Sequence, residues 1–499
     1  MLKWILAIAC SIMFFLGWGS GGLSVFFLGF FLIPLLIAEH YLVGSGLAKY
    51  SIGFASILLF HLFAGYNLIN NLEPLFVIFI FTVNALIQSI PWAVYVSIKS
   101  KINLLPAVLL LIILWLIVEH GSITIGIPSP WFILGNGLYS HPELIQFYEF
   151  SGVSGGSLWI LLSNCISFYC IAGIKTVHSG SYKMAKISLM IFILISPILL
   201  SKQIRFDYKA RTEEVLILNT NQKDRDILGV SFYQLLEESK NNITENTKYV
   251  VWPENIFAST IQLSKVEKSR LVTDVRKYLI VNESILFICG AILSSKSELF
   301  NTALIVGSKS IKLYKKRKLV PFTEYCPRLF QSIKMFRLSD IEFTKGPDKI
   351  ETESISINIC YESLFGQLVS ENCSNSNGRV LVIISNEFWT QGASEFLLGF
   401  CSIRAIENRK FTIRSTNNGI GSVINPNGEV ERLSRTNQSV SALRADIIPN
   451  SYKTFYMRNP DLIGKLSVIL LITFLPFLPI MATLRHERIQ SLHGNEALF

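Results

Sequence analysis

Long apolar runs constrain this chain more than any other feature. A membrane-spanning helix needs about 20 mostly apolar residues, because the hydrocarbon core of a bilayer is roughly 30 Å thick. The composition agrees, since 51% of the residues are hydrophobic, 16% are charged and the mean hydropathy is +0.44, too apolar for an ordinary soluble chain. We expect eight spanning helices, near residues 3–19, 22–43, 50–69, 75–97, 103–119, 154–175, 185–201 and 464–484.

A stretch of ordinary, water-soluble composition separates the seventh and eighth runs. The chain therefore divides into a seven-helix membrane region at 1–204, a soluble domain at 205–460, and a final span with its tail at 461–499. The soluble domain is long enough for one large core of its own. Its β-rich runs alternate with amphipathic stretches, which predicts an α/β layered domain. We expect strands near 214–218, 249–252, 285–288, 303–306 and 380–384, and helices near 230–240, 262–279 and 394–409.

Lysine and arginine in the short loops indicate how the spans are oriented. Alternate connections carry basic residues, among them Lys49, Lys99, Lys183 and, after the last span, Arg485. The opposite connections, at 20–21, 70–74 and 120–153, carry none. This alternation predicts that both termini are cytoplasmic and that the soluble domain lies outside the cytoplasm.

Net charge and cysteine spacing exclude some other functions. The formal net charge is +10, but the lysines are spread over both halves without the basic stripe that nucleic-acid binding needs, so we expect no nucleic-acid partner. The eight cysteines form no CxxC pair and no Cys/His metal spacing, so we expect no metal site and no cofactor. Disulfides among the cysteines of the soluble domain stay open at this point.

A candidate nucleophile stands at the end of one predicted strand. The β-branched run at 356–359 leads directly to Cys360, and a helix is expected to begin just after it. A helix N-terminus lowers the pKa of a nearby thiol towards the reactive thiolate. A single free cysteine is more often a small buried hydrophobe, so this one needs a base and a cation from elsewhere in the chain.

Two further strand ends supply those groups. Glu254 follows a strand that ends at Trp252-Pro253, and Lys316 lies in a basic run just before Leu319. Taken alone, the glutamate would be an exposed turn residue and the basic run a solvated loop. Taken together with Cys360, they provide a base, a cation to stabilise a tetrahedral oxyanion, and a nucleophile. These are the groups that acyl transfer requires.

The same stretches resemble the nitrilase, or carbon–nitrogen hydrolase, superfamily. The resemblance rests on Trp252-Pro253-Glu254, on Leu319-Val320-Pro321-Phe322 after a lysine and on Ile359-Cys360-Tyr361-Glu362. Further support comes from 404–409, 414–420 and 424–428. Eight spans with this domain inserted before the last one narrow the resemblance to the bacterial apolipoprotein N-acyltransferases, and it covers essentially the whole chain.

The resemblance implies an αββα sandwich joined to a polytopic helical bundle. It assigns Glu254 as the base, Lys316 as the oxyanion-stabilising cation and Cys360 as the nucleophile; Lys316 is chosen because it stands three residues before Leu319, as the family's lysine does. The supporting residues that it implies are Glu324, expected to orient the lysine or assist proton transfer, Glu362, expected to support the site from behind, and Tyr361.

The family reaction is a two-step acyl transfer. The cysteine attacks an ester of a membrane phospholipid, typically phosphatidylethanolamine, and forms an acyl thioester. The α-amino group of a diacylglyceryl-cysteine at the N-terminus of an apolipoprotein then takes the acyl chain as an amide. The resemblance also implies the bacterial inner membrane as the location, with the catalytic domain on the periplasmic side.

Two other functions stay open, and separately some stretches depart from the family pattern in ways that bear on the substrate pocket more than on the triad. A membrane-tethered amidase or nitrilase, in which water takes the acyl group, and a degenerate membrane scaffold are the alternatives. Glu387 stands where the family usually has an aspartate, and residues 218–222 depart from the usual Gln-Gly-Asn type of start. Residues 329–338 interleave apolar and basic side chains, which fits either a helix packed on the domain or an arm that dips into the outer leaflet.

Overall fold

The structure is a computed structural model that divides into two compact units. One unit, called the catalytic unit because the three predicted catalytic residues lie in it, holds Arg205–Pro460 and a short segment that ends at Phe76. The other, called the membrane unit because the predicted spans lie in it, holds Val77–Ile204 together with the chain before residue 67 and from Asp461 onward. The described residues are 2–19, 22–41, 44–65, 73–127, 129–174, 180–209, 211–221, 232–255, 259–281, 283–333, 336, 339, 341–347, 352, 354–388, 392–435 and 439–496.

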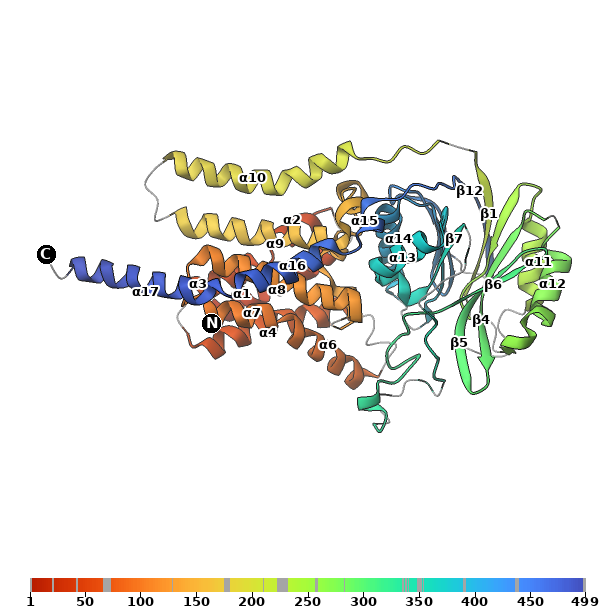
Figure 1. Ribbon diagram of the computed structural model, residues 1–499, viewed down its shortest axis with the longest axis horizontal. Helices are drawn as coiled ribbons and strands as arrows, with labels where there is room; N and C mark the ends of the chain where they lie inside the picture. Colours follow the sequence, from red (N-terminus) through yellow and green to blue (C-terminus); the bar gives the residue numbers. More distant parts are fainter. Residues whose placement is uncertain are drawn as a thin grey trace. The chain divides into compact units, whose positions relative to one another are not determined.

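The membrane unit is a bundle of apolar helices (Figure 1). Six described helices are long and apolar enough to cross a membrane, and a seventh span is added if Leu462–Phe474 and Phe477–His486, bent by 54° at their junction, count as one. The first predicted span is a shorter apolar helix, Leu2–Trp18. The helices are α1 (Leu2–Trp18), α2 (Ser24–Phe30), α3 (Ile33–Tyr41), α4 (Gly46–Ala64), α6 (Pro74–Gln88), α7 (Ile90–Ile98), α8 (Leu104–Ile125), α9 (Tyr148–Ile174), α10 (Gly180–Gln203), α16 (Leu462–Phe474) and α17 (Phe477–Glu496), with short 3₁₀ turns η1 (Pro130–Phe132), η2 (Leu134–Leu138) and η3 (Pro142–Leu144) between α8 and α9.

The two ends of the bundle differ in charge. Near one end, Glu39 forms ion pairs with Lys49 and Lys99, and Arg485 donates to the main-chain carbonyl of Lys99. These basic residues come from connections that the sequence predicts to be cytoplasmic. Elsewhere, Ser24, the first residue of α2, and His141, from the loop at 120–153 that lacks lysine and arginine, have Oγ and Nε2 2.8 Å apart.

The catalytic unit contains two mixed sheets that pack face to face. Sheet I is ordered β12-β1-β2-β4-β5-β6 with β3 beside β4, and sheet II is ordered β7-β8-β9-β10-β11. In the described residues the ladder between the sheets is a single pair, Thr220 with Asn417. The strands are β1 (Glu213–Thr220), β2 (Thr247–Val251), β3 (Thr260–Gln262), β4 (Leu286–Ser295), β5 (Glu298–Val306), β6 (Ile311–Lys315), β7 (Ile355–Ile359), β8 (Val380–Asn386), β9 (Thr412–Asn417), β10 (Ile420–Ile424), β11 (Val430–Arg435) and β12 (Val440–Ile447).

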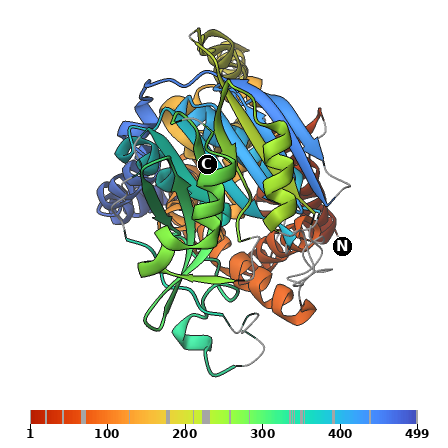
Figure 2. The same ribbon diagram turned by 90° about the vertical axis from the view of Figure 1, so that its right-hand side faces the viewer.

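Helices cover the outer face of each sheet, which gives the predicted αββα sandwich. Sheet I is covered by α11 (Phe232–Asn242) and α12 (Arg270–Tyr278), and sheet II by α13 (Gly366–Asn375) and α14 (Ser394–Asn408). Figure 2 looks onto the α11–α12 side. The prediction of a helical bundle with an αββα domain is confirmed.

Successive side chains of a strand point to opposite faces, so the strands contribute to three separate apolar layers. In β1, Val215 and Ile217 face the core between the sheets, while Leu216 and Leu218 face the helices outside sheet I. In β8, Val382 faces the core between the sheets and Leu381 faces the α13–α14 layer. Because successive side chains of a strand point to opposite faces, a strand buried on both faces is apolar throughout. This explains why these runs carry no clean polar alternation.

One predicted helix is broken. The amphipathic stretch at 262–279 was expected to be continuous, but it contains the 3₁₀ turn η4 (Leu263–Lys268) and then α12. Ser269 separates them, because its hydroxyl caps α12 by accepting from the Val272 amide. A serine at this position competes with helix continuation and favours a new start.

Candidate active site

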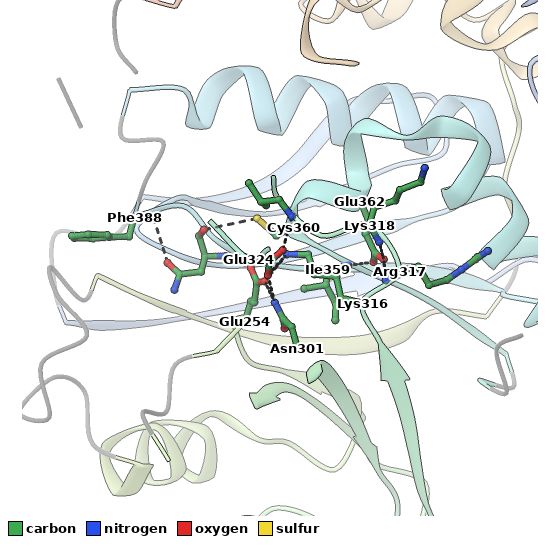
Figure 3. A network of polar contacts seen from close by, with 12 residues as sticks. Glu254, Asn301, Lys316, Arg317, Lys318, Glu324, Ile359, Cys360, Glu362 and Phe388 are labelled. Carbon is green, nitrogen blue, oxygen red and sulfur yellow. Dashed lines mark hydrogen bonds and ion pairs between the residues drawn. The ribbon is translucent and has the colours of Figure 1, made fainter. Parts of the chain in front are cut away.

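The three predicted catalytic residues each follow a strand. Glu254 lies beyond the end of β2, Lys316 directly follows β6, and Cys360 directly follows β7. The turn at Glu254 lies against Gly290 of β4, where a Cβ would come within 2.6 Å of the Glu254 Cα. The glycine is therefore required by the close approach of the two backbones. The structure brings a base, a cation and a thiol from both sheets into one region (Figure 3).

Two carboxylates share one ammonium and one amide in this region. Lys316 Nζ is 3.0 Å from Glu254 Oε1 and 3.0 Å from Glu324 Oε1. Asn301 Nδ2 donates to the same two oxygens, at 2.7 Å each. Glu254 Oε2 accepts from the main-chain amide of Asn386 at 2.8 Å. All four residues of this cluster are at most 8% exposed, and each buried carboxylate is hydrogen-bonded by both the ammonium and the amide, as burial demands.

The charge of Lys316 is secured by its carboxylate neighbours. Burial alone would lower its pKa, but the charges of Glu254 and Glu324 raise the pKa well above its usual value. The neighbouring basic side chains go elsewhere: Lys315 Nζ lies over the Phe300 ring and Lys318 Nζ over the Phe365 ring. Within this run, Lys316 is the basic side chain that reaches the two carboxylates.

Cys360 occupies an unusual backbone conformation beside this cluster. Its φ is +51°, in the left-handed region that non-glycine residues seldom adopt, and such strain is typical of functional turns. Its Sγ lies 3.8 Å from the carbonyl oxygen of Asn386, the residue whose amide binds Glu254. The residue is partly exposed.

The expectation that a helix N-terminus makes this thiol acidic is wrong. Burial of the thiol and the negative charge of Glu254 raise the pKa of Cys360 to about 12, although Lys316 acts to lower it. The helix beginning at Cys360 is the five-residue 3₁₀ turn η7 (Cys360–Leu364), and α13 starts only at Gly366. One short turn lacks the aligned peptide dipoles of a longer helix. The resting sulfur is a neutral thiol, and attack requires a base.

Glu362 ties the nucleophile loop to the lysine loop without contacting the thiol. It is fully buried, and its Oε1 accepts from the amides of Arg317 (2.6 Å) and Lys318 (3.2 Å). Its Oε2 accepts from the Ile359 amide (2.7 Å) and the Tyr314 hydroxyl (2.8 Å). Four donors converge on one carboxylate, so the residues just before Cys360 and just after Lys316 are held in register.

Of the two other predicted supporting residues, Glu324 belongs to the cluster, whereas Tyr361 packs against an aromatic side chain. Glu324 joins the cluster directly and also accepts from the Val320 amide at 2.8 Å, which closes the turn after the lysine. Tyr361 does not join it in a described contact; its ring packs against Phe365 with centroids 5.2 Å apart.

The residues that depart from the family pattern are buried in polar contacts. Glu387 forms an ion pair with Arg414, and both are at most 1% exposed. Asn219 Oδ1 accepts from the Thr416 amide at 3.0 Å, linking β1 to β9. Two residues of these stretches, Gln222 and Trp389, lie outside the described residues.

Sequence reasoning missed three polar residues of the site. Asn301 bridges the two carboxylates, Asn386 binds both Glu254 and the thiol region through its main chain, and Tyr314 supports Glu362. Asn301 had a usable signal, because a polar side chain in the middle of an apolar strand needs a buried partner. The main-chain role of Asn386 has no side-chain signature.

The four-layer fold and its strand-end Glu–Lys–Cys arrangement define a carbon–nitrogen hydrolase domain, and comparison with known families agrees. A family model described as "Carbon-nitrogen hydrolase" matches residues 231–445, and one described as "Apolipoprotein N-acyltransferase N-terminal domain" matches residues 10–166. The chain belongs to the apolipoprotein N-acyltransferases, the membrane-bound branch of the carbon–nitrogen hydrolase superfamily.

Two named relatives are consistent with this assignment, and one solved structure is reported beside them as a similarity only. An apolipoprotein N-acyltransferase 1 from Treponema denticola is 24% identical over 76% of this chain and 78% of its own length. An apolipoprotein N-acyltransferase from Wigglesworthia glossinidia brevipalpis is 28% identical over 64% of each chain. The solved structure of a CN-hydrolase superfamily protein from Xanthomonas campestris is 14% identical and aligns with 48% of this chain and 91% of its own, with a TM-score of 0.36.

Proposed function

We propose that this protein transfers an acyl chain from a membrane phospholipid to the N-terminal diacylglyceryl-cysteine of apolipoproteins, through a thioester on Cys360. The observation that carries the proposal is the buried cluster of Glu254, Lys316, Asn301 and Glu324 beside a neutral thiol. A neutral thiol needs a proton acceptor at the moment of attack, and Glu254 is the carboxylate whose charge raises the pKa of the thiol most.

In the first step, Cys360 Sγ attacks the carbonyl carbon of the donor ester while its proton passes to Glu254. Lys316 stays charged and stabilises the developing oxyanion, because its ammonium is already desolvated and fixed by two carboxylates. The carbon–oxygen bond of the ester then breaks, and the proton on Glu254 passes to the leaving oxygen. The products are an acyl thioester and a lysophospholipid.

In the second step, the α-amino group of the acceptor attacks the thioester. Glu254 takes a proton from the amine, the carbon–sulfur bond breaks, and the sulfur regains a proton. The result is an amide on the acceptor and a restored thiol. A thiolate is a good leaving group, so one nucleophile serves both half-reactions. Phosphatidylethanolamine is the donor that the family resemblance suggests.

Several features support a location for this reaction at the outer face of a bacterial inner membrane. Both substrates are lipid-anchored, so a catalytic domain at 205–460 that is followed by a final span suits them. Basic residues gather around Glu39, whereas the loop at 120–153, which has no lysine or arginine, contacts the start of α2 through His141 and Ser24. The positive-inside rule then puts the Glu39 end in the cytoplasm.

The stretch at 329–338 is a candidate for guiding acyl chains. Phe322, Phe330 and Phe336 pack together, with ring centroids 4.8–5.7 Å apart, and Ile333 is 43% exposed beside them. Lys334, Met335, Arg337 and Leu338 of this stretch lie outside the described residues. Replacing Phe330 and Phe336 by serine should slow phospholipid use while the domain stays folded; unchanged acylation would remove this role.

The proposal is tested by intact-protein mass spectrometry after incubation with phosphatidylethanolamine and no acceptor. Wild-type protein should gain the mass of one acyl chain, removable by neutral hydroxylamine, and Cys360→Ser should show no such hydroxylamine-labile adduct. Adding a diacylglyceryl-cysteine peptide should move the chain to its amino group. Release of free fatty acid at the same rate with and without the peptide would point instead to a hydrolase.

A further inference from the structure

An apolar cavity of about 240 Å³ lies inside the membrane unit, between α2, α9 and α10. Its lining includes Phe26, Phe30, Leu138, Trp159, Ile195 and Ile198. A methylene group occupies about the same volume as a water molecule, about 30 Å³, so the cavity has room for about eight chain carbons. None of these residues belongs to the Glu254 cluster.

Water is a poor occupant of this cavity. Ser163 is the polar side chain among the lining residues, and its hydroxyl already donates to the Trp159 carbonyl at 2.8 Å. The indole of Trp159 is also engaged, since its Nε1 donates to the Ile193 carbonyl at 3.1 Å. A buried water needs two to four polar partners, which this lining does not offer.

The bond between Trp159 and Ile193 has a specific cause. Pro197 lies inside α10 and has no N–H, so the carbonyl four residues earlier, that of Ile193, loses its helical donor. The Trp159 indole supplies the missing donor from α9. This contact fixes the Trp159 ring against α10 and keeps that wall of the cavity in place.

Hydrocarbon can reach the cavity from the side. Only 6% of the membrane-spanning part of α10 is buried within the protein, against 72% for α9. Ile195, which lines the cavity, is 44% exposed, and Phe26 on the opposite wall is 56% exposed. In a membrane those exposed faces contact lipid chains, so the cavity adjoins the bilayer.

Polar groups stand beside one end of the cavity. Ser24 directly precedes the lining residue Val25, and His141 follows Leu138 by three positions. The Ser24 hydroxyl and His141 Nε2 are 2.8 Å apart, and His141 Nδ1 lies 3.3 Å from Glu143 Oε1. This end can hydrogen-bond the ester region of a lipid, while the rest of the cavity suits only its chain.

We propose that the cavity binds one acyl chain of a membrane lipid, with the ester end of the chain beside Ser24 and His141. The site is separate in sequence from the acyl-transfer residues, so the inference goes beyond the proposed function and does not depend on it. The bound chain fills the space that α10 leaves against α2 and α9, and so holds α10, which leads directly into the catalytic unit.

A larger residue at position 29 tests the site, because its side chain would fill the cavity. Gly29 lines the cavity, and a Cβ built on it meets no atom within 4 Å. Gly29→Leu should therefore occupy the cavity without displacing its walls. Gly46→Leu is the matched control, because Gly46 is also a helical glycine with nothing within 4 Å but lies in α4, away from the cavity lining.

The experiment uses the full chain in vesicles of phosphatidylcholine, a small fraction of which carries a diazirine midway along one acyl chain. After irradiation, crosslinks are mapped by peptide mass spectrometry. Trp159 and Ile160, which are 7% and 3% exposed, should be labelled in wild type and in Gly46→Leu, and at least tenfold less in Gly29→Leu. Phe192, 66% exposed on α10, should be labelled equally in all three proteins.

Equal labelling of Trp159 and Ile160 in Gly29→Leu and wild type would overturn the proposal, as would labelling confined to Phe192. If Gly29→Leu does not fold, Ile198→Phe narrows the same cavity from α10 and should cause the same loss. Cys360→Ser should be labelled like wild type, which separates this result from any failure of the proposed acyl transfer.

Discussion

Alkylation of Cys360 tests the state of the nucleophile directly. With a pKa of about 12, against 9.0 for an unperturbed thiol, about one Cys360 in ten thousand is ionised at pH 8, whereas about one ordinary thiol in ten is. Because the thiolate is the reacting form, iodoacetamide should modify Cys360 roughly a thousandfold more slowly than a free thiol at this pH. Desolvation is the largest cause, followed by the charge of Glu254.

The shape of the pH profile separates ionisation from access. Restricted access lowers the rate by the same factor at every pH, whereas a high pKa makes the rate rise about tenfold per pH unit without a plateau up to about pH 10. Cys360→Ser gives the background from the other seven cysteines, which are buried. Lys316→Met should slow alkylation further, because Lys316 lowers the pKa of the thiol. A plateau with a midpoint below about pH 9 would refute this reasoning.

Substitutions at three positions test the supporting structure. Glu362→Gln turns an NH₂ group towards two of the four donors around it, which should cost about 2–6 kcal/mol of stability and lower the thioester yield; thermal unfolding measures this against Glu371→Gln, whose side chain is 36% exposed. Asn301→Leu should slow thioester formation at least tenfold and Asn301→Asp more, because the latter sets a third carboxylate against two; wild-type rates in Asn301→Asp would contradict this. Asp461 is the N-cap of α16, has a backbone φ of +51° and accepts a hydrogen bond from the Ser154 hydroxyl at 2.6 Å. Asp461→Ala should therefore lower the free energy of unfolding by about 2 kcal/mol in a thermal melt, and Asp461→Asn should lower it much less.

Strand ends were the part of the site that sequence could predict. Glu254, Lys316 and Cys360 each follow an apolar run. Their residue types, a base, a cation and a nucleophile, indicated acyl transfer from the sequence alone. The αββα layers were predictable from the resemblance, but not from alternation, because strands such as β1 are apolar on both faces. Burial on two sides removes the pattern by which single strands are usually recognised.

The ionisation of the thiol was not predictable from the same residues. Whether a cysteine before a helix becomes acidic depends on the length of that helix and on which charges lie nearest. Here the turn after Cys360 is short and Glu254 is near, so the pKa rises instead of falling. Likewise, no local pattern states that Asn301, far from Glu254 in sequence, reaches the same oxygen as Lys316.

The junction between the two sheets has a consequence for how the enzyme can be tuned. Glu254 and Lys316 follow strands of sheet I, whereas Cys360 follows a strand of sheet II, and the described ladder between the sheets is the pair of Thr220 and Asn417. The spacing of base and thiol is therefore set by the thickness of the apolar layer between the sheets together with the polar contacts of Glu254 with Asn386 and of Glu362 with Arg317. Ile305 lies in this apolar layer, remote from the polar groups of the site. A larger or smaller side chain at this position should change the separation of the two sheets, and so the reactivity of Cys360, without altering any polar group.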